Sequence, residues 1–239
     1  MCTVSFVKSS AGIIITSNRD EQVLRSAEFP QTHLLNGKPI TFPKDPMAGG
    51  TWFALAHESG RVAVLLNGAE TRHQRASNYR KSRGLVLLDL VSAEETVYQH
   101  WKFYILANIE PFTLIVYENQ TLLQLRWDGI QKSAVELAPT QAYIWSSATL
   151  YSAEVRAQRE NWFNEFLNEH ACPTPADLLQ FHQSTPTADK QTNILMERSP
   201  DLKTISITQV LVTPAELSMH HSDLLTQQSA RLCFDTALI

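Results

Sequence analysis

Polar and hydrophobic residues alternate, or hydrophobic residues form short runs, over most of the first two thirds of the chain. A period of two is typical of β-strands. Residues 3–8 alternate in this way, residues 13–16 are rich in β-branched side chains, and turn residues separate the two segments, so we expect an N-terminal hairpin. Similar patterns predict further strands at residues 51–57, 61–67, 112–117, 122–127, 132–137, 143–147 and 204–213, of which those from 112 to 147 would form a meander.

A helical period of hydrophobic residues appears in separate blocks of the chain. Helices are predicted at residues 84–91, from residue 93 onward, at residues 152–170 and at residues 175–183. For the second of these helices, Ser92 is the expected N-cap because Glu95 follows three residues later. Strands grouped apart from helices predict an α+β fold in which helices face antiparallel sheets. The sequence has no repeat or linker, so we expect residues 1–239 to form a single domain.

The chain has 239 residues, of which 44% are hydrophobic, and a formal net charge of -4. This composition suffices for a packed core and argues against a nucleic-acid surface. Cys2, Cys172 and Cys233 are odd in number and lack a CxxC spacing, which argues against a disulfide framework or a zinc site. The pair His220-His221 would face opposite sides of a strand and chelate a metal poorly. We therefore expect no metal or other cofactor, a reducing, cytoplasmic location, no integral membrane segment, and a small molecule as partner.

Cys2 directly follows the initiator methionine, and this position makes it a candidate nucleophile. Removal of Met1 leaves one residue that carries a thiol, with a pKa of about 8.5, and an α-amine, with a pKa of about 7.7 to 8.0. The amine can take the thiol proton, and the resulting thiolate is the attacking species. A cysteine at the start of an apolar strand is, on its own, more often a small buried hydrophobic residue.

Charged residues follow the second predicted strand, in the segment 17–21. A hairpin brings the end of its second strand beside the start of its first, so Arg19 and Asp20 are expected next to Cys2. An arginine there favours the thiolate, and an aspartate holds and orients the α-ammonium. The commoner interpretation of such a segment in isolation is a surface turn with local ion pairs.

Several short motifs of the first 90 residues occur in a recognisable order. They are Met1-Cys2, Asn18-Arg19-Asp20-Glu21, Gly49-Gly50-Thr51-Trp52, Val64-Leu65-Leu66-Asn67 and Ser82-Arg83-Gly84. In these motifs the chain resembles the transport and Golgi organisation protein 2 family, also called NRDE proteins. The resemblance implies an N-terminal-nucleophile hydrolase-like fold, which is a four-layer αββα sandwich of two antiparallel sheets.

The chain is also similar to the cysteine acylases of the choloylglycine hydrolase group, which likewise begin Met-Cys-Thr. That similarity implies that Cys2 is the nucleophile and that Arg19 lies against its sulfur. Asp20 or Glu21 would bind the α-amine. The similarity also makes Asn67, at the end of an apolar strand, a donor to the oxyanion. An Asn-Gly dipeptide such as the one at this position is equally a common turn, and the two interpretations stay open.

The predicted substrate-binding residues are Asn18, Glu21, Trp52, Ser147 and Arg156. Ser147 stands where relatives tend to have asparagine, and its hydroxyl lacks the paired donor and acceptor of an amide. Arg156 is either a substrate-facing charge or a solvated helix residue. Trp52 fits a pocket wall or, more readily, the core, and the two glycines before it allow a positive φ or a close approach.

The sequence thus predicts a cysteine amidohydrolase that acts on a small non-peptide amide, with Cys2 exposed by removal of Met1. The alternative is a non-catalytic protein that binds or traffics a small molecule, related to haem or lipid, on the same scaffold. A third interpretation, in which Cys2 is merely buried, ranks last. The sequence specifies neither the substrate nor the oligomeric state.

Overall fold

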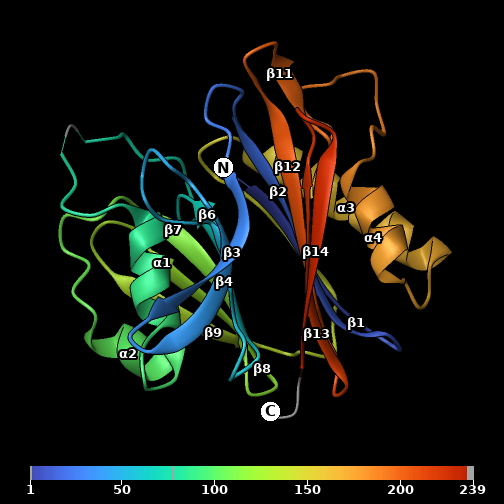
Figure 1. The fold of residues 1–239 in the computed structure, drawn as a ribbon. Helices are drawn as coiled ribbons and strands as arrows, with labels where there is room; N and C mark the ends of the chain where they lie inside the picture. Colours follow the sequence, from blue (N-terminus) through green and yellow to red (C-terminus); the bar gives the residue numbers. More distant parts are fainter. Residues whose placement is uncertain (1, 77, 236–239) are drawn as a thin grey trace.

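The computed structural model describes residues 2–76 and 78–235, and the side chains of Cys2 and Asp235 lie outside the description. Within these residues the chain forms two seven-stranded antiparallel sheets that face each other, with helices on the outer face of each sheet (Figure 1). This arrangement confirms the predicted α+β fold of two antiparallel sheets between helical layers. Among the described residues, no helix has both the length and the apolar content needed to cross a membrane.

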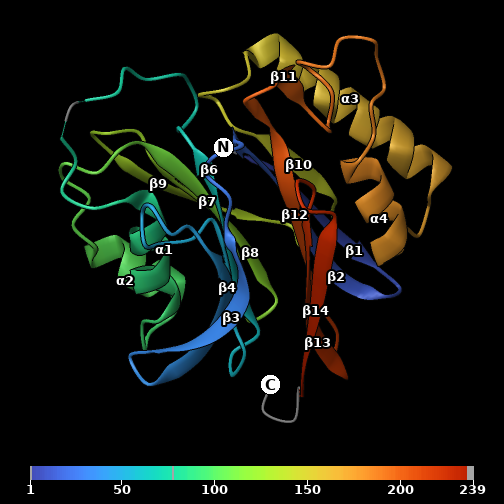
Figure 2. The same ribbon diagram turned by 45° about the horizontal axis from the view of Figure 1, so that its top comes forward.

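The first sheet is built around the predicted N-terminal hairpin and has the strand order β10-β1-β2-β12-β13-β14, with β11 paired to β12. Its strands are β1 (Cys2–Ser9), β2 (Gly12–Gln22), β10 (Tyr143–Ser146), β11 (Glu197–Ser199), β12 (Leu202–Val212), β13 (Glu216–Asp223) and β14 (Gln228–Asp235). The prediction that β10 ends the meander is wrong, because this strand crosses to the first sheet and pairs with β1 (Figure 2). The end of β10 therefore lies beside the start of the chain.

The second sheet is a meander in which each strand pairs with the next along the chain. Its strands are β3 (Glu28–Leu35), β4 (Lys38–Lys44), β5 (Phe53–Ala56), β6 (Arg61–Asn67), β7 (Phe112–Glu118), β8 (Thr121–Trp127) and β9 (Lys132–Leu137). Strands β3 and β4 were not predicted. β3 is an edge strand with several exposed positions, and Pro30 falls where its pairing with β4 shifts register, so it lacks a clean alternation.

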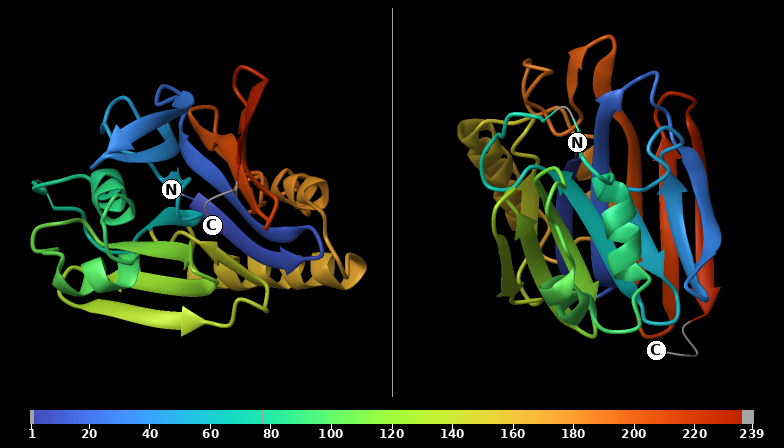
Figure 3. Two further views of the ribbon diagram at one scale, coloured as in Figure 1. Left: turned by 60° about the horizontal axis from the view of Figure 1, so that its bottom comes forward. Right: turned by 90° about the vertical axis from the view of Figure 1, so that its left-hand side faces the viewer.

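Two helices cover each sheet (Figure 3): α1 (Arg83–Val91) and α2 (Val97–Phe103) lie on the second sheet, and α3 (Ala153–Glu169) and α4 (Pro175–His182) lie on the first. The prediction of Ser92 as an N-cap is wrong, because the Ser92 N–H bonds to the Leu88 carbonyl and closes α1. Thr96 begins α2 instead, and Gln99 completes a capping box with it. Two reciprocal hydrogen bonds make this the better start.

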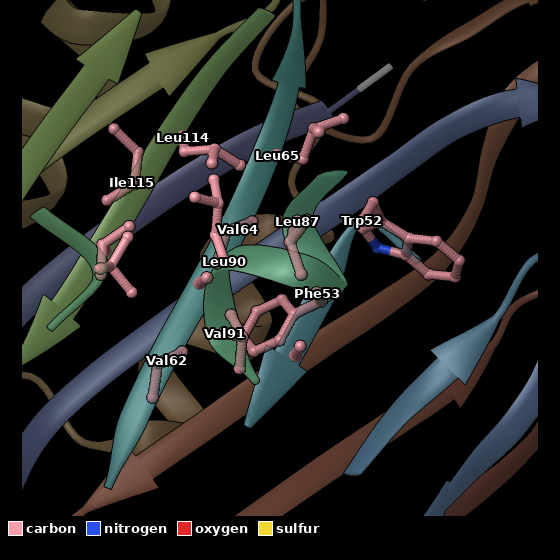
Figure 4. Close-up of a cluster of buried hydrophobic side chains, with 14 of the residues drawn as sticks. Trp52, Phe53, Val62, Val64, Leu65, Leu87, Leu90, Val91, Leu114 and Ile115 are labelled. Atoms are coloured by element: carbon pink, nitrogen blue, oxygen red, sulfur yellow. The ribbon is translucent and has the colours of Figure 1, made fainter. Parts of the chain in front are cut away.

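Helix α1 packs its apolar side onto the second sheet (Figure 4), and Leu87, Leu90 and Val91 belong to the same hydrophobic cluster as Phe53 and Val64. All five side chains are completely buried. Burial of such a side chain stabilises the fold by about 1.5–3 kcal/mol.

Glycines allow the start of α1 to approach the loop before β5. Gly49 has a φ of +69°, which confirms the predicted positive φ. A Cβ on Gly50 would lie 2.5 Å from the carbonyl carbon of Gly84, and a Cβ on Gly84 would lie 2.7 Å from the carbonyl oxygen of Thr51. Backbone contacts of Gly84 with Gly50 and Thr51 therefore hold the segment that leads into Trp52 against the start of α1.

We expect Gly84→Ala to lower the free energy of unfolding by about 1–3 kcal/mol, because the added methyl meets backbone that has no room to move. Urea unfolding measures this loss, which should increase further in Gly84→Val. At an uncrowded helical position the same alanine would stabilise the protein, so an unchanged or higher unfolding midpoint would contradict the close contact.

Candidate functional site

Residues 18–21 lie inside β2, which continues to Gln22 instead of ending before the motif. β2 is a central strand, paired with β1 on one side and β12 on the other. The backbone of Cys2 lies directly opposite Arg19, as the predicted hairpin requires, while the Cys2 side chain lies outside the described residues. Successive strand residues face opposite sides of a sheet, so Arg19 and Asp20 enter different environments.

Arg19 lies on the side of β2 that faces the second sheet, and only 3% of its surface is exposed. Its Nη2 donates to Asp45 Oδ2 over 3.2 Å, and its Nη1 donates to the Arg25 carbonyl over 2.5 Å. The guanidinium carbon is 4.4 Å from the centre of the Trp52 ring, a cation–π geometry. Arg25 also pairs with Asp45, over 2.7 Å. These contacts hold a buried positive charge beside the start of β1.

Trp52 belongs to the hydrophobic core, as predicted, and also forms a wall of the Arg19 site. Its Nε1 is buried and has no hydrogen-bond partner among the described residues. The same holds for the hydroxyls of Ser17 and Ser206, and Ser206 lies opposite Arg19 on β12. Buried polar atoms usually have a partner, so these three atoms are exceptions among the described residues.

Asp20 lies on the other side of β2, toward α3, and is completely buried. Its Oδ2 accepts a hydrogen bond from the Tyr151 hydroxyl over 2.7 Å, and its Oδ1 accepts one from Thr204 over 2.6 Å. Burial raises the pKa of Asp20, and the charge of Arg159 together with these two hydrogen bonds opposes that rise. The carboxylate is thus oriented by two hydroxyl groups and balanced by one cation.

Arg159 of α3 is also completely buried. Its Nε donates to the Thr192 carbonyl over 3.0 Å, its Nη1 donates to Thr3 Oγ1 over 2.5 Å, and its Nη2 donates to the Asn193 carbonyl. The guanidinium carbon stands 3.6 Å from the centre of the Tyr151 ring. Arg159 therefore ties α3 to the first residues of β1.

Asn18 lies on the α4 side of β2 and serves the packing of that helix. Its Nδ2 donates to the carbonyls of His182 and Ile194, over 2.9 Å in each case. Its Oδ1 lies 2.8 Å from His182 Nδ1, and the other ring nitrogen of His182 lies 2.7 Å from the Ser5 hydroxyl. The amide is therefore engaged by protein groups, and its predicted contact with a substrate has no support in these bonds.

Acid should destabilise the protein through His182. Burial, and secondarily the charge of Arg159, lower the pKa of His182 to about 3, against about 6.5 in an unfolded chain. Between these values the unfolded state binds the extra proton, so the free energy of unfolding should fall as the pH drops from about 6.5 to 3, by roughly 4 kcal/mol. In His182→Gln, urea unfolding at several pH values should show a shallower slope. An unchanged slope would contradict a neutral buried imidazole.

Asn67 and Ser147 meet through the main chain. The Ser147 hydroxyl is buried and donates to the Asn67 carbonyl over 2.7 Å. In register Asn67 lies opposite Phe112, whose ring packs edge-on against Trp101 of α2. Because paired residues point to the same face of a sheet, the Asn67 side chain also lies on the helix-covered face of the second sheet. Ser147 therefore contacts the backbone of β6 and not the Asn67 amide.

The two remaining predicted residues lie at the rim of this region. Glu21 accepts hydrogen bonds from the Gln22 N–H and from Arg25. Arg156 is half-buried on α3, and its Nη2 donates to the Glu70 carbonyl over 3.0 Å. Arg156 thus lies against the loop that carries Glu70, whereas Arg19 contacts Asp45 and Trp52.

Sequence reasoning missed Asp45, Tyr151 and Arg159. Asp45 precedes a proline and caps the N–H groups of the following turn, which is the only role its local sequence signals. Tyr151 precedes α3 and Arg159 lies within it, and no local sequence pattern distinguishes either of them from a surface residue. Their contacts with Asp20 and Thr3 join parts of the chain that are more than a hundred positions apart.

A family model of transport and Golgi organisation 2 matches residues 1–224. The chain belongs to the transport and Golgi organisation 2 family. The match continues beyond the motifs of the first 90 residues and includes α3, α4 and β12, which supply Arg159, His182 and Thr204. No curated protein matches the chain. In this member of the transport and Golgi organisation 2 family, no group of three His, Cys, Asp or Glu side chains within the described residues is arranged to hold a metal ion.

Proposed function

We propose that the protein is a cysteine N-terminal-nucleophile amidohydrolase that acts on a small non-peptide amide. The observation that carries this proposal is the pairing of Cys2 with Arg19 at the end of the β1–β2 ladder. Arg19 is a buried cation held by Asp45 and Trp52. A positive charge within about 4–6 Å shifts a neighbouring acidic group by about 1–3 pKa units toward its ionised form.

The proposed reaction begins when removal of Met1 exposes the α-amine of Cys2. The amine takes the thiol proton, and the sulfur forms a bond to the amide carbonyl carbon. The carbon–nitrogen bond then breaks, and the leaving nitrogen takes the proton from the α-ammonium. Water attacks the resulting thioester with the amine as base, which releases the carboxylic acid and restores the thiol.

Asp20 is the acid that we assign to the α-ammonium. It is the next residue on β2 beyond the Cys2–Arg19 pair, which is where the ladder would continue toward the freed amine. Its carboxylate is already oriented by Tyr151 and Thr204. Glu21 is less suited, because its carboxylate is engaged by Arg25 and by a backbone N–H.

Asn67 stays the predicted oxyanion donor in this proposal. Its amide would have to turn from the α2 side of the sheet at the strand end, where Gly68 follows with a φ of +83°. The contribution of such a donor is typically about 2.7–4 kcal/mol of barrier. The variant Asn67→Ala tests the oxyanion donor separately, because it should lower turnover and leave the labelling of Cys2 unchanged.

Mass spectrometry of the purified protein tests the first requirement, since a retained Met1 would end the α-amine mechanism. The chain offers its own control for the second, because Cys172 and Cys233 are exposed thiols. Iodoacetamide at limiting amounts should label Cys2 well ahead of both. Equal labelling of the three cysteines would overturn an activated Cys2.

Turnover separates the hydrolase from the non-catalytic carrier. A panel of small acyl amides should be hydrolysed by the wild-type protein and by Cys172→Ala, and left intact by Cys2→Ala. A protein that binds members of the panel without cleaving any of them would instead support the binding or trafficking alternative.

A further inference from the structure

Two adjoining cavities lie at the edge of the first sheet, between β10, β8 and α3. Their volumes are about 110 and about 360 Å³, and both are lined by Arg126, Ile144, Trp145 and Glu160. Together they have the size of a small-molecule site. The smaller one reaches the strand ends around Asn67 and Ser147, since it is also lined by Leu66, Gly68, Ser146 and Ala148.

The larger cavity is lined by polar side chains, such as Gln124 and Asn164, and by apolar or aromatic ones. The apolar and aromatic members include Leu137, Ala142, Tyr143 and Phe163. The rings of Tyr143 and Trp145 are stacked, with centroids 5.6 Å apart and planes inclined by 19°. Flat rings of this kind favour the face of another planar or apolar group. We therefore expect these two rings to contact a flat, apolar part of a ligand.

The smaller cavity carries two arginines on its wall. The Arg156 guanidinium donates to the Glu70 carbonyl, pairs with no acidic side chain in the described part of the chain, and has a buried Nε without a partner. Arg126 also has a buried Nε without a partner, and its Nη1 donates to the exposed carboxylate of Glu70. Guanidinium groups bind carboxylates through paired N–H donors, and most of the donors of Arg156 are still available.

We propose that this double cavity binds a small organic carboxylate with a flat, apolar body, and that Arg126 and Arg156 bind its carboxylate. Glu70 holds Arg126 until the ligand carboxylate takes its place. The other acidic residue on the wall, Glu160, is exposed on α3 and solvated. The ligand carboxylate can therefore replace that of Glu70 at Arg126, while the carboxylate of Glu160 stays in water.

The position of the cavity also assigns a substrate class, a step that rests on the proposed function. In register Thr3 lies opposite Ser146, so the cavity wall is one residue along β1 from Cys2. An amide whose carboxylate lies between the two arginines would extend toward the start of β1. The substrate class is therefore an amide that carries a free carboxylate.

Binding of a matched pair of probes tests the carboxylate site. The measurement is isothermal titration of Cys2→Ala with 3-phenylpropanoate and with its neutral isostere 3-phenylpropanamide. The variant lacks the proposed nucleophile, so neither probe can be cleaved. The carboxylate should bind at least about tenfold more tightly than the amide. Arg126→Gln and Arg156→Gln should each remove most of this preference, and Glu70→Gln should increase it. The control Arg231→Gln, on β14 at the opposite edge of the sheet, should leave it unchanged.

Equal affinities for the two probes, or no effect of the arginine variants, would overturn the carboxylate site. Thermal unfolding of each variant checks that the fold is intact. We expect it to be, because both arginines are partly exposed and neither is part of the core. Failure here leaves the labelling of Cys2 by neutral iodoacetamide untouched. Failure of that labelling leaves the carboxylate site in place as a binding site, so the two proposals are separable.

Discussion

Arg159→Met should lower the free energy of unfolding by about 3–5 kcal/mol, the largest loss that we expect from any single substitution in this protein. The variant leaves the carbonyls of Thr192 and Asn193 and the hydroxyl of Thr3 without their buried donor. It also removes the cation that opposes the raised pKa of Asp20. Urea unfolding at pH 7 measures the loss.

The matched control is Arg156→Met, one turn earlier on α3, which should cost less than about 1 kcal/mol because that guanidinium is only half-buried. Equal losses in the two variants would contradict a structural role specific to Arg159. Because Asp20 and Arg159 interact, Asp20→Asn combined with Arg159→Met should cost less than the sum of the two single losses.

The deficit of Arg159→Met should also depend on pH. Without the cation the pKa of folded Asp20 rises further, so the folded state holds its proton up to a higher pH than the unfolded state does. A raised carboxyl pKa contributes stability that is lost as the pH increases through it. The difference between wild type and variant should therefore be smaller under acidic conditions than at pH 7.

Arg19→Gln should slow the alkylation of Cys2 by iodoacetamide at pH 7 about tenfold, if the proposed thiolate is correct. Loss of a neighbouring cation raises a thiol pKa by about 1–3 units, and the rate follows the thiolate fraction. The measurement is the pH dependence of the labelling rate, whose midpoint should move upward by about one unit or more. An unchanged midpoint would contradict a role for Arg19 in activating Cys2.

Two further variants separate this electrostatic effect from a structural one. Arg19→Lys keeps the charge and should return the midpoint toward the wild-type value. Arg25→Gln removes the second cation that contacts Asp45, one whose side chain is 35% exposed, and should shift the midpoint much less. Labelling of Cys172 and Cys233 should be the same in all of these proteins.

Local patterns predicted much of the scaffold that carries this site. The hairpin was predicted from alternation and turn residues, and it brings Arg19 opposite Cys2. The boundaries of α3 and α4 were nearly correct because Ser152 and Thr174 are good N-caps. The extension of β2 through residues 18–21 was missed, since a run of polar residues reads as a loop until strands on both sides pair with it.

Residues of the same type received different roles that the sequence did not distinguish. Arg156 and Arg159 lie three positions apart on α3, yet one lines a cavity and the other is a buried counter-charge. The prediction named only Arg156. In the same way Asn18 and Asp20 are neighbours on one face of β2, but α4 covers the first and Tyr151 contacts the second.

The sequence by itself determined the two-sheet α+β class, the N-terminal hairpin and the nearness of Arg19 to the first residue of β1. These features depend on hydrophobic periodicities of two and 3.6 residues and on the residues that favour turns and helix caps. All of these signals act over a few neighbouring positions. Only the tertiary structure decided that β10 leaves the meander, that Arg159 and Tyr151 enclose Asp20, and that Arg126 and Arg156 share a cavity. Those contacts join distant parts of the chain, and they are selected by the simultaneous burial of apolar surface and pairing of polar groups when the two sheets and their helices assemble.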